Sequence, residues 1–199
     1  SLRALGYSLG AAVSDLIDNS ISVGSTSIEI CFDWNKGEPF ATFLDNGQGM
    51  STAELVEAMR LGGAGPSAVR QTNDLGRYGL GLKTASFSQC GRLTVATKQK
   101  DEVSCARWDT ELMASSQSGW ELLSDPANGS ESRLLALQSQ SSNGTIVLWE
   151  LLRTGMEGTL PRFLEALEQL ESHIAMVFQG FIEGEIRKVA IRLNGRVVK

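Results

Sequence analysis

Apolar residues recur along the chain at two spacings, and each spacing predicts a different kind of element. Positions three and four apart predict helices over residues 8–21, 51–59, 81–89 and 159–180. Ser8 is the expected N-cap of the first helix, and Ser51 with Glu54 forms a capping box for the second. The last helix is long and amphipathic, with acidic residues on its polar face.

Alternation at every second residue predicts strands. These are expected over residues 27–33, 40–44, 91–98, 103–109, 119–123, 133–138 and 144–151, with a terminal hairpin around Asn194-Gly195 over residues 185–199. Helices and strands fall largely in separate groups, which is typical of an α+β fold. We therefore expect a mixed, mostly antiparallel sheet with helices on one face.

The length of 199 residues fits one domain, or one domain with a short second piece. We expect residues 1–155 to form the main domain. Residues 156–199 would supply a helix and a hairpin that begin a following region. Both ends of the chain lie within or next to predicted elements, so we expect a fragment of a larger protein.

Composition narrows the class of protein. Hydrophobic residues make up 42% and charged residues 21%, which is ordinary for a globular domain. The net charge of −5 does not mark the domain as a nucleic-acid surface, and no apolar run reaches the ~20 residues of a membrane span. Cys31, Cys90 and Cys105 lie in apolar or strand-like stretches without CxxC spacing, so we expect buried free thiols in a reducing, cytoplasmic compartment.

Asp15 and Asn19 lie four residues apart on the first predicted helix and so share one face. A carboxylate and a carboxamide so placed can hold a water and a hard cation, because Mg²⁺ prefers a few oxygen ligands and keeps several waters. The alternative is a solvated polar face of the helix.

A glycine-rich loop, Asp45-Asn46-Gly47-Gln48-Gly49-Met50, follows an apolar strand. Glycines at alternate positions let the backbone approach a planar ligand closely, and Asp45 can accept from an exocyclic amine. The alternative is a glycine-rich turn with a helix-capping aspartate.

A second glycine-rich segment precedes the helix that ends near residue 89. Its sequence is Gly76-Arg77-Tyr78-Gly79-Leu80-Gly81-Leu82-Lys83-Thr84, and glycines leading into a helix with Lys83 and Thr84 suit a phosphate group. It is not a P-loop, because Leu82 occupies the lysine position and the preceding segment is polar where a buried strand is needed. With residues 60–80 it forms a long predicted loop.

The segment Gly6-Tyr7-Ser8-Leu9-Gly10 matches the nucleophile elbow of serine hydrolases. Only five residues precede Gly6, too few for the strand that an elbow requires, and the single histidine, His173, lies inside a helical pattern. We therefore interpret Ser8 as a helix cap and His173 as a helix-face or core residue.

The order of these motifs, followed by Gly144-Thr145 before an apolar strand, resembles the GHKL ATPases over about residues 5–150. That superfamily includes gyrase B subunits, the ninety-kilodalton heat-shock chaperones, histidine kinases, MutL and MORC proteins. The sequence is most similar to MORC-like bacterial ATP-binding proteins, through residues 15–20 and 77–90. The resemblance implies an α/β sandwich with ATP between the helices and the sheet.

The resemblance also implies roles for single residues. Asn19 would coordinate Mg²⁺, and Asp45 would accept from the adenine amino group with Thr145 assisting through water. Gly47, Gly49 and Met50 would line the adenine pocket. The phosphates would be held by Gly76, Gly79, Gly81, Leu82, Lys83 and Thr84, with residues 60–80 as a lid.

Asp15 departs from the family pattern, because hydrolytic members carry glutamate there as the base that positions water. Aspartate is one methylene shorter, and a misplacement of about 1 Å can cost on the order of 100-fold in rate. We therefore expect a slow, Mg²⁺-dependent ATPase whose hydrolysis resets a lid and a dimer interface. The alternative is a nucleotide-gated binding module with little turnover. The resemblance allows homodimerisation on ATP and a DNA or protein client bound outside this fragment.

Overall fold

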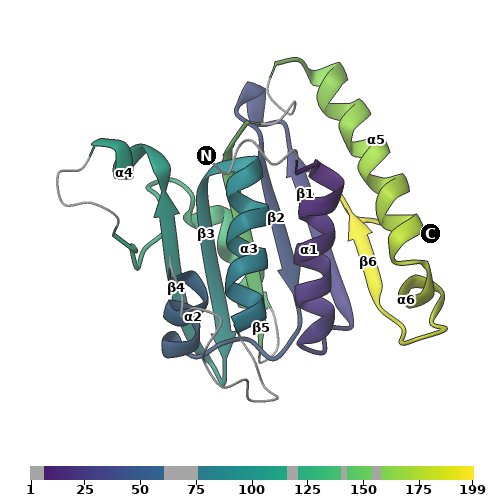
Figure 1. Cartoon of the computed structure of the whole chain (residues 1–199), viewed down its shortest axis with the longest axis horizontal. Helices are drawn as coiled ribbons and strands as arrows, with labels where there is room; N and C mark the ends of the chain where they lie inside the picture. Colours follow the sequence, from purple (N-terminus) through teal and green to yellow (C-terminus); the bar gives the residue numbers. More distant parts are fainter. Residues whose placement is uncertain (1–6, 61–75, 116–120, 140–142, 154–157) are drawn as a thin grey trace.

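The computed structural model describes residues 7–60, 76–115, 121–139, 143–153 and 158–199, and these build one seven-stranded mixed sheet (Figure 1). The strand order is β4-β3-β5-β2-β1-β6-β7. Only the β1–β6 pair is parallel among the described strands; the other pairs are antiparallel. The strands are β1 Ser27–Asp33, β2 Phe40–Asp45, β3 Cys90–Gln99, β4 Glu102–Asp109, β5 Gly144–Leu152, β6 Ala190–Leu193 and β7 Arg196–Val197.

The long helices cover one face of the sheet, as the sequence predicts. In Figure 1, α1 and α3 lie over the sheet, and α5 lies beside α1 toward the β6 edge. The helical segments are α1 Leu9–Ser22, α2 Thr52–Met59, α3 Gly76–Gln89, α4 Thr110–Ser115, α5 Leu160–Val177, α6 Gln179–Glu183 and the short 3₁₀ turns η2 Asn35–Gly37 and η3 Glu131–Ser139.

The predicted helix caps are present. The Ser8 side chain accepts from the Ala11 backbone N–H at 3.1 Å, which places the start of α1 at Leu9. Ser51 and Glu54 form the reciprocal capping box of α2. These local signals lie entirely within the sequence, and the structure follows them.

The structure corrects the secondary structure predicted for part of residues 131–139. The alternation over 133–138 predicted a strand, but this segment is the 3₁₀ helix η3. Leu134 and Leu137 pack against Leu44, Ala96 and Ile146, on the face of the sheet opposite the long helices. Burial of these leucines against the second apolar face of the sheet outweighs the local preference of the segment for a strand.

Two further expectations differ from the structure. Helix α3 begins at Gly76, five residues before the predicted start. Of the predicted strand 119–123, the described part contributes a single bridge between Leu123 and Arg107, and the remainder of that prediction lies partly outside the described residues.

The cysteines are all free, but their burial differs. Cys90 is buried as predicted, Cys105 is half-buried, and Cys31 is exposed, which corrects the expectation of burial. Cys31 and Asp33 lie on the exposed side of β1, whereas Ile30 and Phe32 lie on its buried side.

The C-terminal segment joins the same sheet. β6 pairs in parallel with β1, and the buried side chains of α5 belong to the same apolar core as those of α1. The boundary near residue 155 stays a prediction. In the part of the chain that is described, no helix combines the length and apolar character needed to cross a bilayer.

Candidate functional site

Three polar side chains form one row across neighbouring strands of the sheet. Asp45 of β2 is opposite Thr145 of β5, and Thr145 is opposite Thr97 of β3. Two residues away on each strand, the next row on the same face is apolar: Phe43, Val147 and Val95. Because side chains alternate along a strand, both rows face the long helices. The sheet thus presents an apolar floor that ends in a polar edge.

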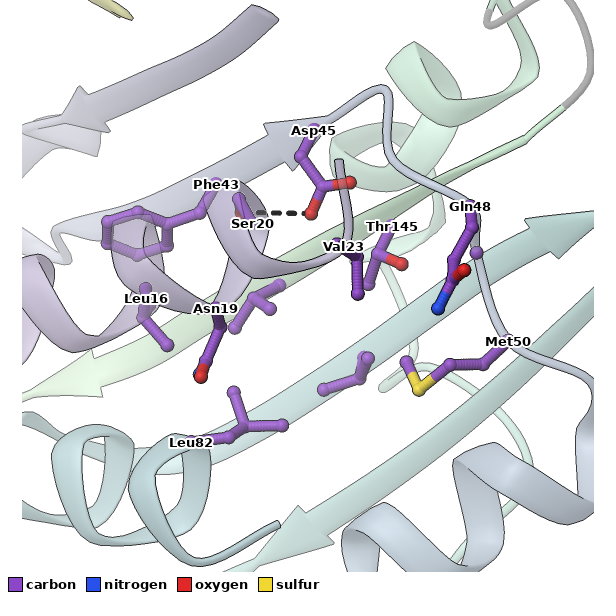
Figure 2. A pocket seen from close by; sticks show the side chains of 13 residues that line it. Leu16, Asn19, Ser20, Val23, Phe43, Asp45, Gln48, Met50, Leu82 and Thr145 are labelled. Atoms are coloured by element: carbon purple, nitrogen blue, oxygen red, sulfur yellow. Dashed lines mark hydrogen bonds between the residues drawn. The ribbon is translucent and has the colours of Figure 1, made fainter. Parts of the chain in front are cut away.

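A pocket lies over this floor, between α1, α3 and the glycine-rich loop after β2 (Figure 2). Its empty space, counted together with the adjoining open solvent, is about 570 Å³. An apolar cavity with a few polar groups is typical of a small-molecule site. Its lining is Leu16, Asn19, Ser20, Val23, Phe43, Asp45, Gln48, Gly49, Met50, Leu82, Val95, Thr145 and Val147.

Asp45 is 7% exposed, and several donors hold its carboxylate in place. Ser20 Oγ donates to one oxygen at 3.0 Å, while Ser25 Oγ at 3.2 Å and the Gly47 N–H at 2.8 Å donate to the other. Burial raises the pKa of Asp45 above its ordinary value, and hydrogen bonds from Gly47, Ser20, Ser25 and the Thr145 backbone offset part of that rise. The carboxylate is therefore a fixed acceptor at the polar edge.

The loop requires glycine at two of its positions. A Cβ on Gly47 would lie 2.7 Å from both Ser25 Oγ and Val23 Cγ2. Gly49 has a φ of +66°, and a Cβ there would lie 2.1 Å from the Lys98 carbonyl oxygen. At both positions, the atoms that leave no room for a side chain belong to the protein itself. Of the two glycines, Gly49 lines the pocket.

Asn19 lines the pocket from α1, and Figure 2 shows its side chain directed into the space that Leu82 faces from α3. Asp15 lies one turn earlier on the same helix, half-buried, and accepts a hydrogen bond from the Tyr7 hydroxyl. That bond to Asp15 raises the pKa of Tyr7. Asp15 is not among the residues that line the pocket.

The remaining residues expected at the phosphates lie on α3. Leu82 lines the pocket, whereas Gly81, Lys83 and Thr84 do not. The Lys83 amine donates to the Arg60 carbonyl, and burial lowers its pKa. Gly76 and Gly79 lie within the first turns of α3. Residues 61–75, most of the predicted lid, lie outside the described residues.

Sequence reasoning missed Thr97, which connects the polar edge to the loop. Its hydroxyl lies 3.1 Å from Thr145 Oγ1 and accepts from the Met50 N–H at 2.8 Å. One signal of this role was present in the sequence. Thr97 follows Leu93 and Val95 at alternate positions of the strand, so it is a polar residue at a position where the pattern predicts a buried side chain. Seven residues that line the pocket were also not predicted for the site, and most of them show only the ordinary hydrophobic periodicity of a core. They are Leu16, Ser20, Val23, Phe43, Gln48, Val95 and Val147.

The hydrolase alternative has no geometric support. Ser8 caps α1, and His173 Nε2 lies 3.0 Å from Ser14 Oγ where α5 packs on α1. Among the described residues, no three His, Cys, Asp or Glu side chains gather into a metal site.

The profile of the histidine kinase-, DNA gyrase B- and HSP90-like ATPases matches residues 7–145, which is more than half of the chain. The chain belongs to this ATPase family. The matched segment contains α1, the glycine-rich loop and the first residues of β5, and so includes every residue of the pocket except Val147.

Relatives of this GHKL domain include three proteins named as MORC ATPases. ATPase MORC2B of Mus musculus is 31% identical over 100 residues, which cover 49% of this chain and 10% of the relative. ATPase morc-1 of Caenorhabditis elegans is 29% identical over 89 residues, 45% of this chain and 10% of the relative. ATPase MORC2 of Homo sapiens is 28% identical over 100 residues, with coverage of 49% and 10%. The similarity thus spans about a tenth of each relative.

Proposed function

We propose that this chain binds ATP with Mg²⁺ in the pocket and hydrolyses it slowly. The fixed carboxylate of Asp45 is the observation that carries the proposal. A buried acceptor that Ser20, Ser25 and Gly47 hold in place suits the amino group of adenine, since it cannot turn away from the ligand. Thr145 would assist through water.

The rest of the base would lie on the apolar floor, against the glycine-rich loop. Gly47 backs Asp45, while Gly49 and Met50 line the cavity at its polar end. An apolar floor with one acceptor edge would bind the ring by burial and orient it by hydrogen bonding.

The phosphates would extend from the base toward Asn19 and α3, where we place Gly76, Gly79, Gly81, Leu82, Lys83 and Thr84 around them. A Cβ built on Gly81 would meet no described atom outside its own helix within 4 Å. Lys83 would exchange the Arg60 carbonyl for a phosphate oxygen.

The Asn19 side chain fits a role in holding Mg²⁺, because its amide oxygen is a hard ligand placed within the pocket. Bound beside the phosphates, Mg²⁺ would neutralise part of their charge. Asp15, one turn away on α1, would position the attacking water. Dimerisation on ATP and a DNA or protein client are further parts of the proposal.

A second function, a nucleotide-gated binding module with little turnover, is favoured by the surroundings of Asp15. Its carboxylate is engaged by Tyr7 and lies outside the pocket lining. Such a module would close on ATP and recruit a partner without using hydrolysis. The two functions share the pocket and differ only in what Asp15 does.

Thermal unfolding with and without Mg-ATP tests the pocket. ATP at about 100 times its dissociation constant adds ~2.7 kcal/mol to the folded state, which for a chain of this size raises the unfolding midpoint by roughly 5–10 °C. We expect Asn19→Ala and Asp45→Ala to abolish the shift and Asp125→Ala, at an exposed position, to keep it. A folded wild-type protein with no shift would contradict the proposal.

Phosphate release then separates the two functions. If Asp15 positions water, Asp15→Ala abolishes turnover while the Mg-ATP shift persists, and Asp15→Glu, which restores the longer reach, does not lower the rate. Turnover that is unchanged in Asp15→Ala would remove Asp15 from the chemistry. Binding without turnover in the wild type would support the gated module.

A further inference from the structure

A hydrogen bond from Tyr7 holds the carboxylate of Asp15, the group assigned above to the attacking water. Tyr7 lies two residues before the start of α1, and its hydroxyl donates to Asp15 Oδ2 in the second turn of that helix. An ionised carboxylate only accepts, so the proton in this bond belongs to Tyr7. The bond raises the pKa of Tyr7, and the hydroxyl therefore keeps its proton at neutral pH and stays a donor.

Tyr7 is itself anchored to another helix. Gln89, the last residue of α3, is 1% exposed, and its side-chain amide donates to the Tyr7 carbonyl oxygen at 3.0 Å. Tyr7 also packs against the main apolar core. Because both its main chain and its ring are held in this way, the hydroxyl does not follow the Asp15 carboxylate when that group turns. Asp15 must leave Tyr7 in order to move.

The bond keeps Asp15 engaged outside the candidate pocket. Leu16 and Asn19 of the same helix line the pocket, whereas Asp15 does not. The two oxygens of a carboxylate form one rigid group, so holding Oδ2 at Tyr7 also fixes Oδ1. A carboxylate that turns toward the pocket therefore gives up the hydrogen bond from Tyr7.

The proposed hydrolysis requires such a turn. A water oxygen bonds to the γ-phosphorus of ATP, and the bond from that phosphorus to the bridging oxygen breaks, so that ADP leaves. Asp15 accepts the proton that the water loses and later releases it to solvent. An interaction that is present before this step and absent in its transition state raises the barrier without changing nucleotide binding.

We propose that Tyr7 is a positioning residue that restrains Asp15 and thereby slows ATP hydrolysis. The inference rests on the proposed function, in which Asp15 serves the attacking water. Tyr7 is not among the residues that line the pocket, and it sets the rate through Asp15. Slow turnover then has a second cause besides the short reach of aspartate.

Phosphate release by Tyr7→Phe tests the restraint, because phenylalanine keeps the ring and removes only the hydroxyl. We expect kcat to rise roughly three- to tenfold, the effect of one hydrogen bond, and KM for Mg-ATP to stay the same. An unchanged kcat would overturn the inference. So would a fall in kcat, because it would show that Tyr7 holds Asp15 where hydrolysis needs it.

Ser8→Ala is the matched control. Ser8 is next to Tyr7, and its side chain caps α1 by accepting from the Ala11 N–H. Loss of this cap loosens the start of the helix but leaves the Tyr7 hydroxyl in place. We expect kcat of this variant to equal that of the wild type. A rise as large as that of Tyr7→Phe would assign the effect to the helix start and overturn the inference.

Carbon-13 NMR of the ring carbon that bears the tyrosine hydroxyl gives a readout independent of turnover. The chain has two tyrosines, Tyr7 and Tyr78, and Asp15→Ala should move the signal of Tyr7 by removing its acceptor. In the wild type, Mg-ADP with aluminium fluoride, a mimic of the phosphoryl group in transfer, should move this signal the same way. Mg-ADP alone should not. A Tyr7 signal that stays unchanged with the mimic bound would overturn the inference, even if Tyr7→Phe does not fold.

The outcomes separate the inference from the proposed function. A wild type that binds Mg-ATP, with Tyr7→Phe no faster in turnover, overturns the inference alone. If the wild type binds Mg-ATP without turnover, Tyr7→Phe must gain turnover, and a variant that stays inactive overturns the inference. A folded wild type that does not bind Mg-ATP overturns the proposed function and the inference with it.

Discussion

At the scale of single residues, Asp45 is central to the proposed site, and burying its charged carboxylate lowers the stability of the fold. Its carboxylate is buried, and burial disfavours the charged form. Hydrogen bonds from Ser20, Ser25 and Gly47 compensate only in part, so the pKa of the carboxyl stays raised. Ionised Asp45 should therefore destabilise the empty protein.

The sign of this effect gives a prediction in pH. A raised pKa means that the folded chain holds the Asp45 proton more tightly than the unfolded chain does. The stabilisation that comes from this tighter proton binding is fully present below the ordinary carboxyl pKa of about 4. It is lost as pH rises through the raised pKa that Asp45 has in the folded chain. We expect the unfolding midpoint of the wild type to fall relative to Asp45→Asn as pH rises across that window.

The measurement is thermal unfolding of both proteins from about pH 4 to about pH 8. Asp125→Asn controls for the loss of one negative charge at an exposed position. Parallel midpoint curves for the wild type and Asp45→Asn would contradict the assignment of this pH dependence to Asp45.

At the scale of elements, α1 connects the pocket to the C-terminal helix. One side of α1 packs in the core, and its C-terminal half carries Asn19 and Ser20 into the pocket. Near its start, a Cβ on Gly10 would lie 2.9 Å from the His173 ring of α5. The helices are thus in close contact at Gly10, and His173 is fixed there by its contact with Ser14.

We expect Gly10→Ala to destabilise the protein by about 1–3 kcal/mol, because the added methyl overpacks the α1–α5 contact. In a His173→Ala background, the same substitution should be neutral or stabilise by about 0.5–1 kcal/mol, since alanine suits a helix better than glycine. Chemical denaturation of the four proteins measures the difference. Equal destabilisation in both backgrounds would show that the His173 ring is not the cause.

At the scale of the whole molecule, the far end of the chain completes the fold beside its beginning. β6 extends the sheet from β1, and Arg187 donates to the carbonyls of Ile21 and Ser25 at the end of α1. Ser25 in turn donates to Asp45. The C-terminal segment therefore supports one wall of the candidate pocket.

Removing residues 184–199 should abolish cooperative folding. Val189, Ile191, Leu193 and Val198 are buried, and burial of four such side chains contributes about 6–12 kcal/mol, a sum comparable to the stability of a whole domain at about 5–15 kcal/mol. Circular dichroism melting tests this, with removal of the exposed Lys199 alone as control. A truncated chain that still melts cooperatively would instead support the domain boundary predicted near residue 155.

The sequence by itself determined most of the elements and three of the polar residues that line the pocket, Asn19, Asp45 and Thr145. Caps and periodicity are local, so Ser8 and the alternation of β1 and β2 were sufficient to predict their elements. The family resemblance implied six site residues that the structure brings to the pocket lining: Asn19, Asp45, Gly49, Met50, Leu82 and Thr145. Their roles toward ATP stay predictions.

Tertiary structure alone decided which strands became neighbours and what covers each face of the sheet. The segment 133–138 could alternate as a strand, yet it forms η3 because Leu137 covers an apolar face that no local pattern reveals. Thr97 acquired its partners only through the β3–β5 register and the return of the loop at Met50. Contacts between residues 47 positions apart depend on the whole sheet, and local sequence carries no signal for them.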